Sequence, residues 1–296
     1  EFAKDKTFGY QSSDLREYVE EKTKGKYKKE SCICISEKEL EEKNVESVLQ
    51  KLLQTEAFNK VIVNARTYEQ LEVFCTAYIE AVKAGKHFLA RTAAAFPKVL
   101  GGVTDQPLLD RTALRGAEKN GGIVLVGSHV QKTTKQLECL KESKADMEFM
   151  EFDVNTCFEE GGLKKEAERI VAEAERVISK GRTAVVYTSR KLLTPDTTDK
   201  DKILELSVQI SDAVTSIIGK LKVKPAFIIA KGGITSSDVG TKALHVKKAN
   251  VMGQVQKGIP VWMTGKESKF PGMPYIIFPG NVGEVSTLRQ IVEELA

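Results

Sequence analysis

The sequence has no hydrophobic run that approaches the ~20 residues a membrane-spanning helix needs. It also opens on a charged stretch, not on the basic and then apolar segment that marks a secretory leader. We therefore expect a chain that neither crosses nor inserts into a membrane.

Cysteine and histidine are scarce. The five cysteines form no C-x-x-C pair, and none clusters with the three histidines. A disulfide framework or a zinc site needs such groupings, so neither is expected and no metal ligand is assigned. Scattered cysteines are typical of a reducing compartment, which makes the cytoplasm the predicted location. The cysteines are Cys32, Cys34, Cys75, Cys139 and Cys157.

Charge of one sign is not in marked excess. The net charge of +4 is the difference between 45 Lys and Arg and 41 Asp and Glu residues, which are interleaved, as in Glu21-Lys22. No basic stripe is present that could follow a phosphate backbone, so nucleic acid is not an expected partner. A hydrophobic content of 41% is ordinary for a folded protein, and 296 residues are enough for two α/β units.

Short β-rich runs alternate with longer amphipathic stretches along the whole chain. This order predicts an α/β fold with two open, mostly parallel sheets flanked by helices. A polar segment over 101–120 is the predicted border between a domain of residues 1–118 and a domain of residues 119–296. The predicted strands of the first domain are 32–36 and 60–63, and its helices are 45–53 and 68–84.

The second domain has the alternation expected of a complete Rossmann-like nucleotide-binding domain. Its predicted strands are 123–126, 147–154, 184–187, 226–230, 261–264 and 275–278. Its predicted helices are 133–140, 163–180, 202–220 and 285–295.

Glycine-rich turns follow three of these strands. They are Gly127-Ser128, Gly232-Gly233-Ile234-Thr235-Ser236 and Gly280-Asn281-Val282-Gly283. Ligands of open α/β sheets bind at the carboxyl ends of the strands, and glycine lets the backbone approach a phosphate closely. We therefore expect the three turns to converge on a phosphate-bearing ligand.

Other interpretations of the same residues stay open. A glycine turn followed by a Ser or Thr helix cap needs no ligand. The sequence contains neither G-x-x-x-x-G-K-[ST] nor G-x-G-x-x-G, and an oxidoreductase that binds a dinucleotide would need the latter. A regulatory module that binds a nucleotide without transferring phosphate is a further alternative, and His129 has no partnered acid and stays unassigned.

Arg91 and Thr92 interrupt an otherwise apolar stretch over 88–100. A guanidinium in apolar surroundings needs an anionic or carbonyl partner. A structural ion pair and a clamp for substrate or phosphate satisfy this need equally well.

From Phe88 to the end, the sequence resembles the four-carbon acid sugar kinase family. Four motifs carry the resemblance, in the family's order and with similar spacing. They are Arg91-Thr92-Ala93-Ala94-Ala95, Gly127-Ser128 with Thr133 and Gln136, the turn from Gly232 to Ser236, and Gly280-Asn281-Val282-Gly283. Members of this family use ATP to phosphorylate acids such as threonate, erythronate and their oxo forms. Their amino-terminal domain binds the sugar acid and their carboxyl-terminal domain binds the nucleotide.

The resemblance implies that residues 119–296 bind ATP, with Ser128 and the turns at Gly232 and Gly280 around it. Mg²⁺ would bridge the phosphate oxygens. Residues 1–118 resemble the later part of the substrate domain, because the family's opening D-D-x-T-G motif is not found. We assign no catalytic residue, and a preceding segment or a second copy of the chain stays open as a protein partner. Pro279 and Val282 also depart from the commoner Ser-Gly-Asn-Phe-Gly, so the sugar acid is not specified.

Overall fold

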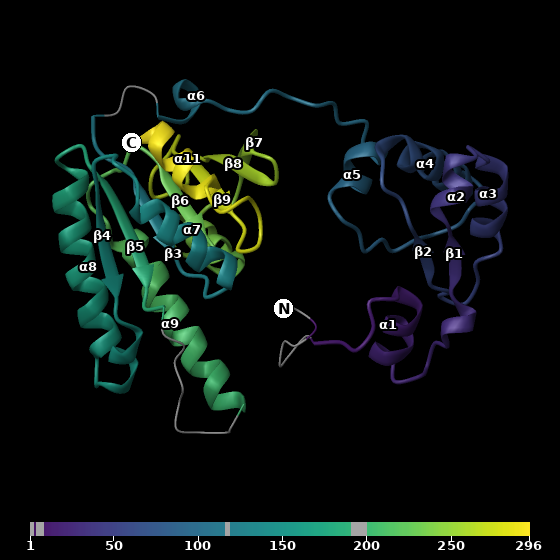
Figure 1. Ribbon diagram of the computed structural model, residues 1–296, viewed down its shortest axis with the longest axis horizontal. Helices are drawn as coiled ribbons and strands as arrows, with labels where there is room; N and C mark the ends of the chain where they lie inside the picture. Colours follow the sequence, from purple (N-terminus) through teal and green to yellow (C-terminus); the bar gives the residue numbers. More distant parts are fainter. Residues whose placement is uncertain (1–2, 4–8, 116–118, 191–199) are drawn as a thin grey trace. The chain divides into compact units, whose positions relative to one another are not determined.

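The computed structural model describes residue 3 and residues 9–115, 119–190 and 200–296. The chain folds into two units, residues 1–105 and 106–296 (Figure 1). Each unit has its own hydrophobic core. The two units are described separately.

The first unit contains a two-stranded parallel sheet, β1 (Ile33–Ile35) and β2 (Val61–Val63). Ile35 at the end of β1 is fully buried against Leu40, Leu52 and Phe74. Capping boxes at Ser36 and Thr67 fix where two of the helices begin, because side chain and backbone satisfy each other's hydrogen bonds there. The helices are α1 (Leu15–Lys22), α2 (Glu37–Glu41), α3 (Val45–Leu53), α4 (Tyr68–Lys83) and α5 (Ala95–Leu100), with a 3₁₀ turn η2 (Lys29–Ser31).

The second unit is built on a seven-stranded sheet in the order β4-β5-β3-β6-β9-β8-β7. The first five strands in this order are parallel, and β8 and β7 continue the sheet antiparallel. The strands are β3 (Ile123–Val126), β4 (Met147–Phe152), β5 (Thr183–Thr188), β6 (Ile228–Lys231), β7 (Ala249–Gln256), β8 (Ile259–Thr264) and β9 (Pro274–Phe278).

Helices cover both faces of this sheet (Figure 1). Alternate residues of β3 point to opposite faces: Ile123 and Leu125 pack with α8 and α9, and Val124 and Val126 pack with α7 and α11. This double covering is why the central strands consist almost wholly of buried apolar residues. The helices are α6 (Arg111–Arg115), α7 (Gln131–Lys141), α8 (Gly162–Ile178), α9 (Lys200–Lys220), α10 (Gly233–Asp238) and α11 (Thr287–Leu295), with a 3₁₀ turn η3 (Val154–Phe158) and a π-helical turn η4 (Val239–Ala243).

The structure confirms the predicted α/β class, with mostly parallel sheets flanked by helices. The predicted bounds of α3 and β3 match the structure residue for residue. The antiparallel edge strand β7 was not predicted. Its sequence, Ala-Asn-Val-Met-Gly-Gln-Val-Gln, contains a glycine and few buried residues, so neither a buried run nor a clean alternation marks it.

The border between the units lies earlier in the chain than the predicted border after residue 118. Leu109 N donates to Gln254 O at 2.9 Å, and Leu114 is fully buried in the core of the second unit. Arg111 donates to the carbonyls of Glu294 and Ala296 at 3.0 and 2.8 Å. These bonds and the buried leucine tie the segment 106–115 to the second unit.

Gly122 lies just before β3, where a β-carbon would overlap the ring of the fully buried Phe227. We expect Gly122→Ala to lower the free energy of unfolding by about 2–3 kcal/mol, because a packed ring leaves little room to relax. Urea unfolding of the full chain measures this change.

Gly219→Ala is the matched control. A β-carbon at Gly219, inside α9, would lie 3.6 Å from Ala243 Cα, which is an ordinary contact. Alanine in a helix interior is favoured over glycine by about 1 kcal/mol, so this variant should be as stable as the parent or more so. Equal losses in both variants would contradict the packing argument.

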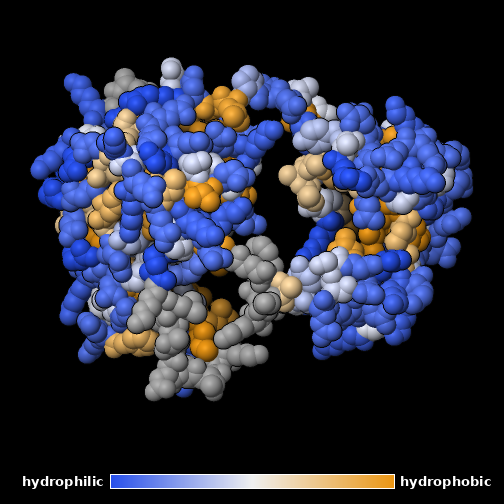
Figure 2. All heavy atoms as spheres, viewed as in Figure 1, coloured by the Kyte–Doolittle hydropathy of each residue, from blue (hydrophilic) through white to orange (hydrophobic). Residues whose placement is uncertain are grey.

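Among residues 9–115, 119–190 and 200–296, no helix combines the length and the hydrophobicity of a membrane span. Hydrophilic residues cover most of the visible face of each unit (Figure 2).

Candidate functional site

The three glycine-rich turns follow three strands that are neighbours in the sheet. β6 pairs in parallel with β3 on one side and with β9 on the other. Gly127 and Ser128 follow β3, Gly232 follows β6, and Gly280 follows β9 after one proline. The carboxyl ends of these strands therefore bring the predicted turns together at one edge of the sheet.

Ser128 lies between the other two turns. A β-carbon added at Gly232 would lie 3.1 Å from Ser128 Cβ, and one added at Gly280 would lie 3.1 Å from Ser128 Oγ. Backbone bonds tie the same turns together, because Gly232 N donates to Phe278 O at 2.9 Å and Gly127 N donates to Lys231 O at 3.1 Å. Glycine is required here for close approach of one backbone to another.

Gly232 has a φ of 132°, a conformation that residues with a β-carbon rarely adopt. It is the cap residue of α10, and no side chain caps this helix. The Ser/Thr cap of the alternative interpretation is therefore not formed. Gly233 differs, since it has no left-handed φ and a β-carbon there would meet nothing within 4 Å. The space beside its α-carbon is therefore open over at least this distance, and Gly233 is exposed.

The next three residues of this turn have different surroundings. Ile234 is 74% exposed, whereas Thr235 and Ser236 are buried. Ser236 Oγ donates to Gly233 O at 3.1 Å, and Ser236 O accepts from the buried Tyr275 hydroxyl at 2.5 Å. Ser236 therefore holds the turn in place, and its hydroxyl proton is already used.

The turn after β9 is held through its backbone carbonyls. Thr133 Oγ1 donates to Gly280 O at 3.0 Å. Gln136 Nε2 donates to Val282 O at 3.1 Å and to Glu284 O at 2.8 Å. Both side chains come from α7 and are fully buried. This structural role explains why Thr133 and Gln136, which the sequence analysis grouped with Gly127-Ser128, are polar although they are buried.

Lys231, the last residue of β6, is fully buried beneath this edge. Its Nζ donates to Pro279 O at 2.6 Å and to Gly280 O at 3.1 Å, and lies 4.1 Å from the centre of the Phe278 ring. Burial, with a smaller contribution from the charge of Lys132, lowers the pKa of Lys231 to about 7. The sequence analysis missed this residue, although a lysine inside an apolar strand sequence is an unusual signal.

Arg190 was also missed, since a single arginine after a strand forms no motif. It is half-buried, and its Nη2 donates to Ser128 O and to Thr134 Oγ1, both at 2.7 Å. Arg190 and Lys231 thus reach Ser128 and Gly280 from two strands that flank β3. Neither side chain has a carboxylate partner within the described part of the chain.

Arg91 and Thr92 lie in the first unit, in a segment without helix or strand between α4 and α5. Both residues are exposed, and the Arg91 guanidinium lies 5.9 Å from the centre of the Tyr18 ring. The apolar neighbours of Arg91 in the sequence therefore do not bury it. An exposed guanidinium needs no partner, and among the described residues no ion pair includes Arg91.

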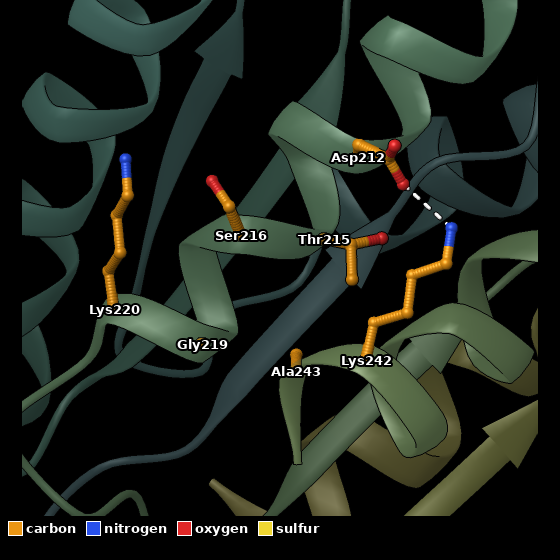
Figure 3. Close-up of a pocket in the computed structure, with 7 residues that line it drawn as sticks. All are labelled: Asp212, Thr215, Ser216, Gly219, Lys220, Lys242 and Ala243. Atoms are coloured by element: carbon orange, nitrogen blue, oxygen red, sulfur yellow. Dashed lines mark hydrogen bonds and ion pairs between the residues drawn. The ribbon is translucent and has the colours of Figure 1, made fainter. Parts of the chain in front are cut away.

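A groove of about 410 Å³ lies between α9 and η4 (Figure 3). Lys242 points across it to Asp212, with Nζ and Oδ1 2.7 Å apart, and also bonds Asp238 at 3.1 Å. The groove runs along a helix, away from the strand ends, and its central charges neutralise each other. It is therefore a weaker candidate than the three turns. Its lining residues are Asp212, Thr215, Ser216, Gly219, Lys220, Lys242 and Ala243.

The residues at the three turns fit a nucleotide better than a directly bound metal ion. The turns are rich in glycine, the side of Gly233 is open, and Arg190 and Lys231 have no carboxylate partner among the described residues. In the described ranges, no group of three or more His, Cys, Asp or Glu residues could hold a metal ion. A Mg²⁺ ion at this edge would depend on phosphate oxygens and water for most of its ligands.

Comparison with protein families gives two matches. Residues 123–288 match a nucleotide-binding C-terminal domain, and residues 1–100 match a sugar-binding N-terminal domain. The first match alone covers more than half of the chain. No curated protein matches the chain.

Solved structures share the fold at low sequence identity. A Salmonella typhimurium LT2 protein, provisionally described as a tRNA synthase, has a TM-score of 0.55 and 17% identity, over 88% of this chain and 59% of that protein. A Haemophilus influenzae protein has a TM-score of 0.52 and 16% identity, over 98% of this chain and 66% of its own length. The chain thus spans less than two thirds of these two proteins.

Proposed function

This chain belongs to the four-carbon acid sugar kinase family, and on that premise we propose that it serves in the ATP-dependent phosphorylation of a four-carbon sugar acid. We assign nucleotide binding to the second unit, which includes residues 119–296, and part of the site for an acid of the threonate, erythronate or oxo-tetronate type to the first unit, residues 1–105. Five free cysteines favour a reducing compartment, so we place the protein in the cytoplasm.

The observation that carries this proposal is the convergence of three glycine turns at the ends of β3, β6 and β9. A β-carbon added at Gly232 or Gly280 would lie 3.1 Å from Ser128, so these two glycines let the turns pack closely, and the open space lies beside Gly233, where an added β-carbon meets nothing within 4 Å. Arg190 and Lys231, for which the described residues supply no carboxylate partner, lie beside this edge. Transfer of a phosphoryl group depends mainly on positioning and on neutralising charge, which backbone N–H groups and fixed cations supply.

Bound ATP would supply the phosphoryl group, and Mg²⁺ would neutralise part of the charge of its phosphates. This chain's own contribution is to bind and orient. Ser128 offers a hydroxyl between two backbone turns, and Gly233 leaves room for a phosphate. Lys231 and the α7 side chains hold the third turn in register with the other two.

Titration calorimetry of the full chain with ATP·Mg and with NADH tests which nucleotide the chain binds. We expect ATP to bind and NADH not to bind, and preference for NADH would overturn the proposal in favour of a dinucleotide enzyme. An assay of ADP release with a panel of threonate, erythronate and oxo-tetronate isomers tests the acceptor. ATP binding without transfer to any acid would instead favour a regulatory module.

A further inference from the structure

Arg190 lies at the edge of the sheet where the three turns meet. It follows β5, which pairs in parallel with β3 so that Tyr187 lies opposite Val126. The segments after these two residues therefore leave the sheet side by side. The bond from Arg190 Nη2 to Ser128 O, at 2.7 Å, brings the guanidinium to the turn after β3.

The guanidinium is only partly satisfied. Nη2 donates to Ser128 O and Thr134 Oγ1, whereas Nε and Nη1 are buried without a hydrogen-bond partner among the residues that the structure describes. An arginine has five N–H donors and cannot discard its charge, so buried donors without acceptors cost free energy. Such a group in a native fold calls for a ligand or water to satisfy it.

Several other arginines of the second unit pair with carboxylates, whereas Arg111 and Arg115 donate to backbone oxygens. Arg169, Arg182 and Arg289 bond carboxylates at 2.6 to 2.9 Å, and these bonds raise their pKa values. Burial instead lowers the pKa of Arg190. Glu138 acts on Arg190 only through space, because no ion pair within the described residues includes it. Arg190 is thus a fixed positive charge with no directly bonded carboxylate in the described part of the chain.

Two lysines add positive charge at the turns that adjoin Arg190. Lys231 lies beneath the adjoining turns, and Lys132 on α7 donates to Gly283 O at 3.2 Å. This concentration of positive charge beside glycine turns favours an anion with several charges.

We propose that Arg190 binds the phosphate groups of the nucleotide and supplies the cation that a lysine supplies in P-loop proteins. The inference rests on the proposed nucleotide site. The bonds from Arg190 Nη2 to Ser128 O and Thr134 Oγ1 fix the guanidinium. Nε and Nη1 of the same side chain remain as donors for phosphate oxygens. Arginine suits this task because its planar donors match phosphate geometry and its charge persists at every physiological pH.

Arg190→Gln tests the proposal, with Arg182→Gln as the matched control. Arg182 stands at the opposite, amino end of the same strand and pairs with Asp146 and Glu148. Titration calorimetry of each full-length variant uses ATP, inorganic tripolyphosphate and adenosine. We expect Arg190→Gln to weaken ATP and tripolyphosphate about 10- to 100-fold, the usual effect of losing a hydrogen bond to a charged group. Adenosine affinity, and all affinities of Arg182→Gln, should stay within about twofold.

Arg190→Gln that binds ATP and tripolyphosphate as the parent does would overturn the proposal. If the parent binds tripolyphosphate but no ATP, and Arg190→Gln loses the tripolyphosphate, the nucleotide function fails and the anion site stands. Binding of neither ligand by the parent overturns both. Arg190→Lys covers the case in which the glutamine variant does not fold: it keeps the charge but loses donors, and unchanged affinity in it also overturns the proposal.

Discussion

Gly233→Val should fold as the parent chain does and lose at least about 100-fold in ATP affinity. A β-carbon at Gly233 meets nothing within 4 Å, so the protein itself has room for the side chain. The branched side chain would fill the open space above the turn, which the proposed phosphates need, and a displaced charge-assisted contact costs enough to give this loss. Titration calorimetry with ATP·Mg measures the affinity, and urea unfolding measures the stability.

Gly232→Ala separates ligand approach from backbone strain. Gly232 has a φ of 132°, and its β-carbon would lie 3.0 Å from Thr235 Oγ1. We expect this variant to lose stability by about 1–3 kcal/mol, because the backbone is strained there, whereas Gly233→Val should lose less than about 1 kcal/mol. If Gly233→Val binds ATP as tightly as the parent, the turn after β6 is not part of the nucleotide site.

ATP affinity should fall about tenfold between pH 7 and pH 9. The pKa of Lys231 in the free protein is about 7, because burial disfavours the ammonium. A bound polyanion favours the ammonium and raises that pKa, so binding takes up a proton between the free and the bound pKa. Affinity is therefore highest below about pH 7 and falls as the pH rises toward the bound pKa, tenfold for a pKa change of about one unit.

Lys231→Met isolates the protein's part of this pH dependence. The methionine side chain does not titrate. The phosphates of ATP are ionised to the same degree at each pH in the titrations of the parent and of the variant. We expect a flat affinity from pH 7.5 to 9 in this variant. If ATP affinity falls with pH equally in the parent and the variant, the proton taken up on binding belongs to a group other than Lys231.

Periodicity in the sequence was sufficient to predict most of the second sheet. The runs at Ile123–Val126 and Ala184–Tyr187 are apolar because helices cover both faces, and such runs can be recognised without a structure. The place of β7 could not be predicted in this way. It is an edge strand with exposed residues such as Val251, so burial does not impose a pattern on it.

The candidate site could be predicted only in part, for a related reason. Glycine turns after strands are local patterns, and the parallel order of the sheet then brings them together. Arg190 and Lys231 carry no local pattern, because their roles depend on bonds to Ser128 and Gly280, which are distant in sequence. Thr235 and Ser236 were expected near the nucleotide as donors. Their burial in the turn depends on contacts with Gly127 and Tyr275, which spacing alone cannot supply.

The attachment of the turn after β9 has a consequence for how this protein can vary. Three side chains hold this turn by hydrogen bonds to main-chain oxygens of residues 279–284, and these side chains are Lys231, Thr133 and Gln136. Every amino acid has such an oxygen, so the turn can exchange its side chains while its path is preserved. Pro279 and Val282, the two departures from the motif that the sequence resembles, are therefore compatible with an unaltered support. Mutational scanning should accordingly find Lys231, Thr133 and Gln136 intolerant and positions 279 and 281 permissive for stability, while position 282, where Val282 packs against the core, should accept apolar residues best.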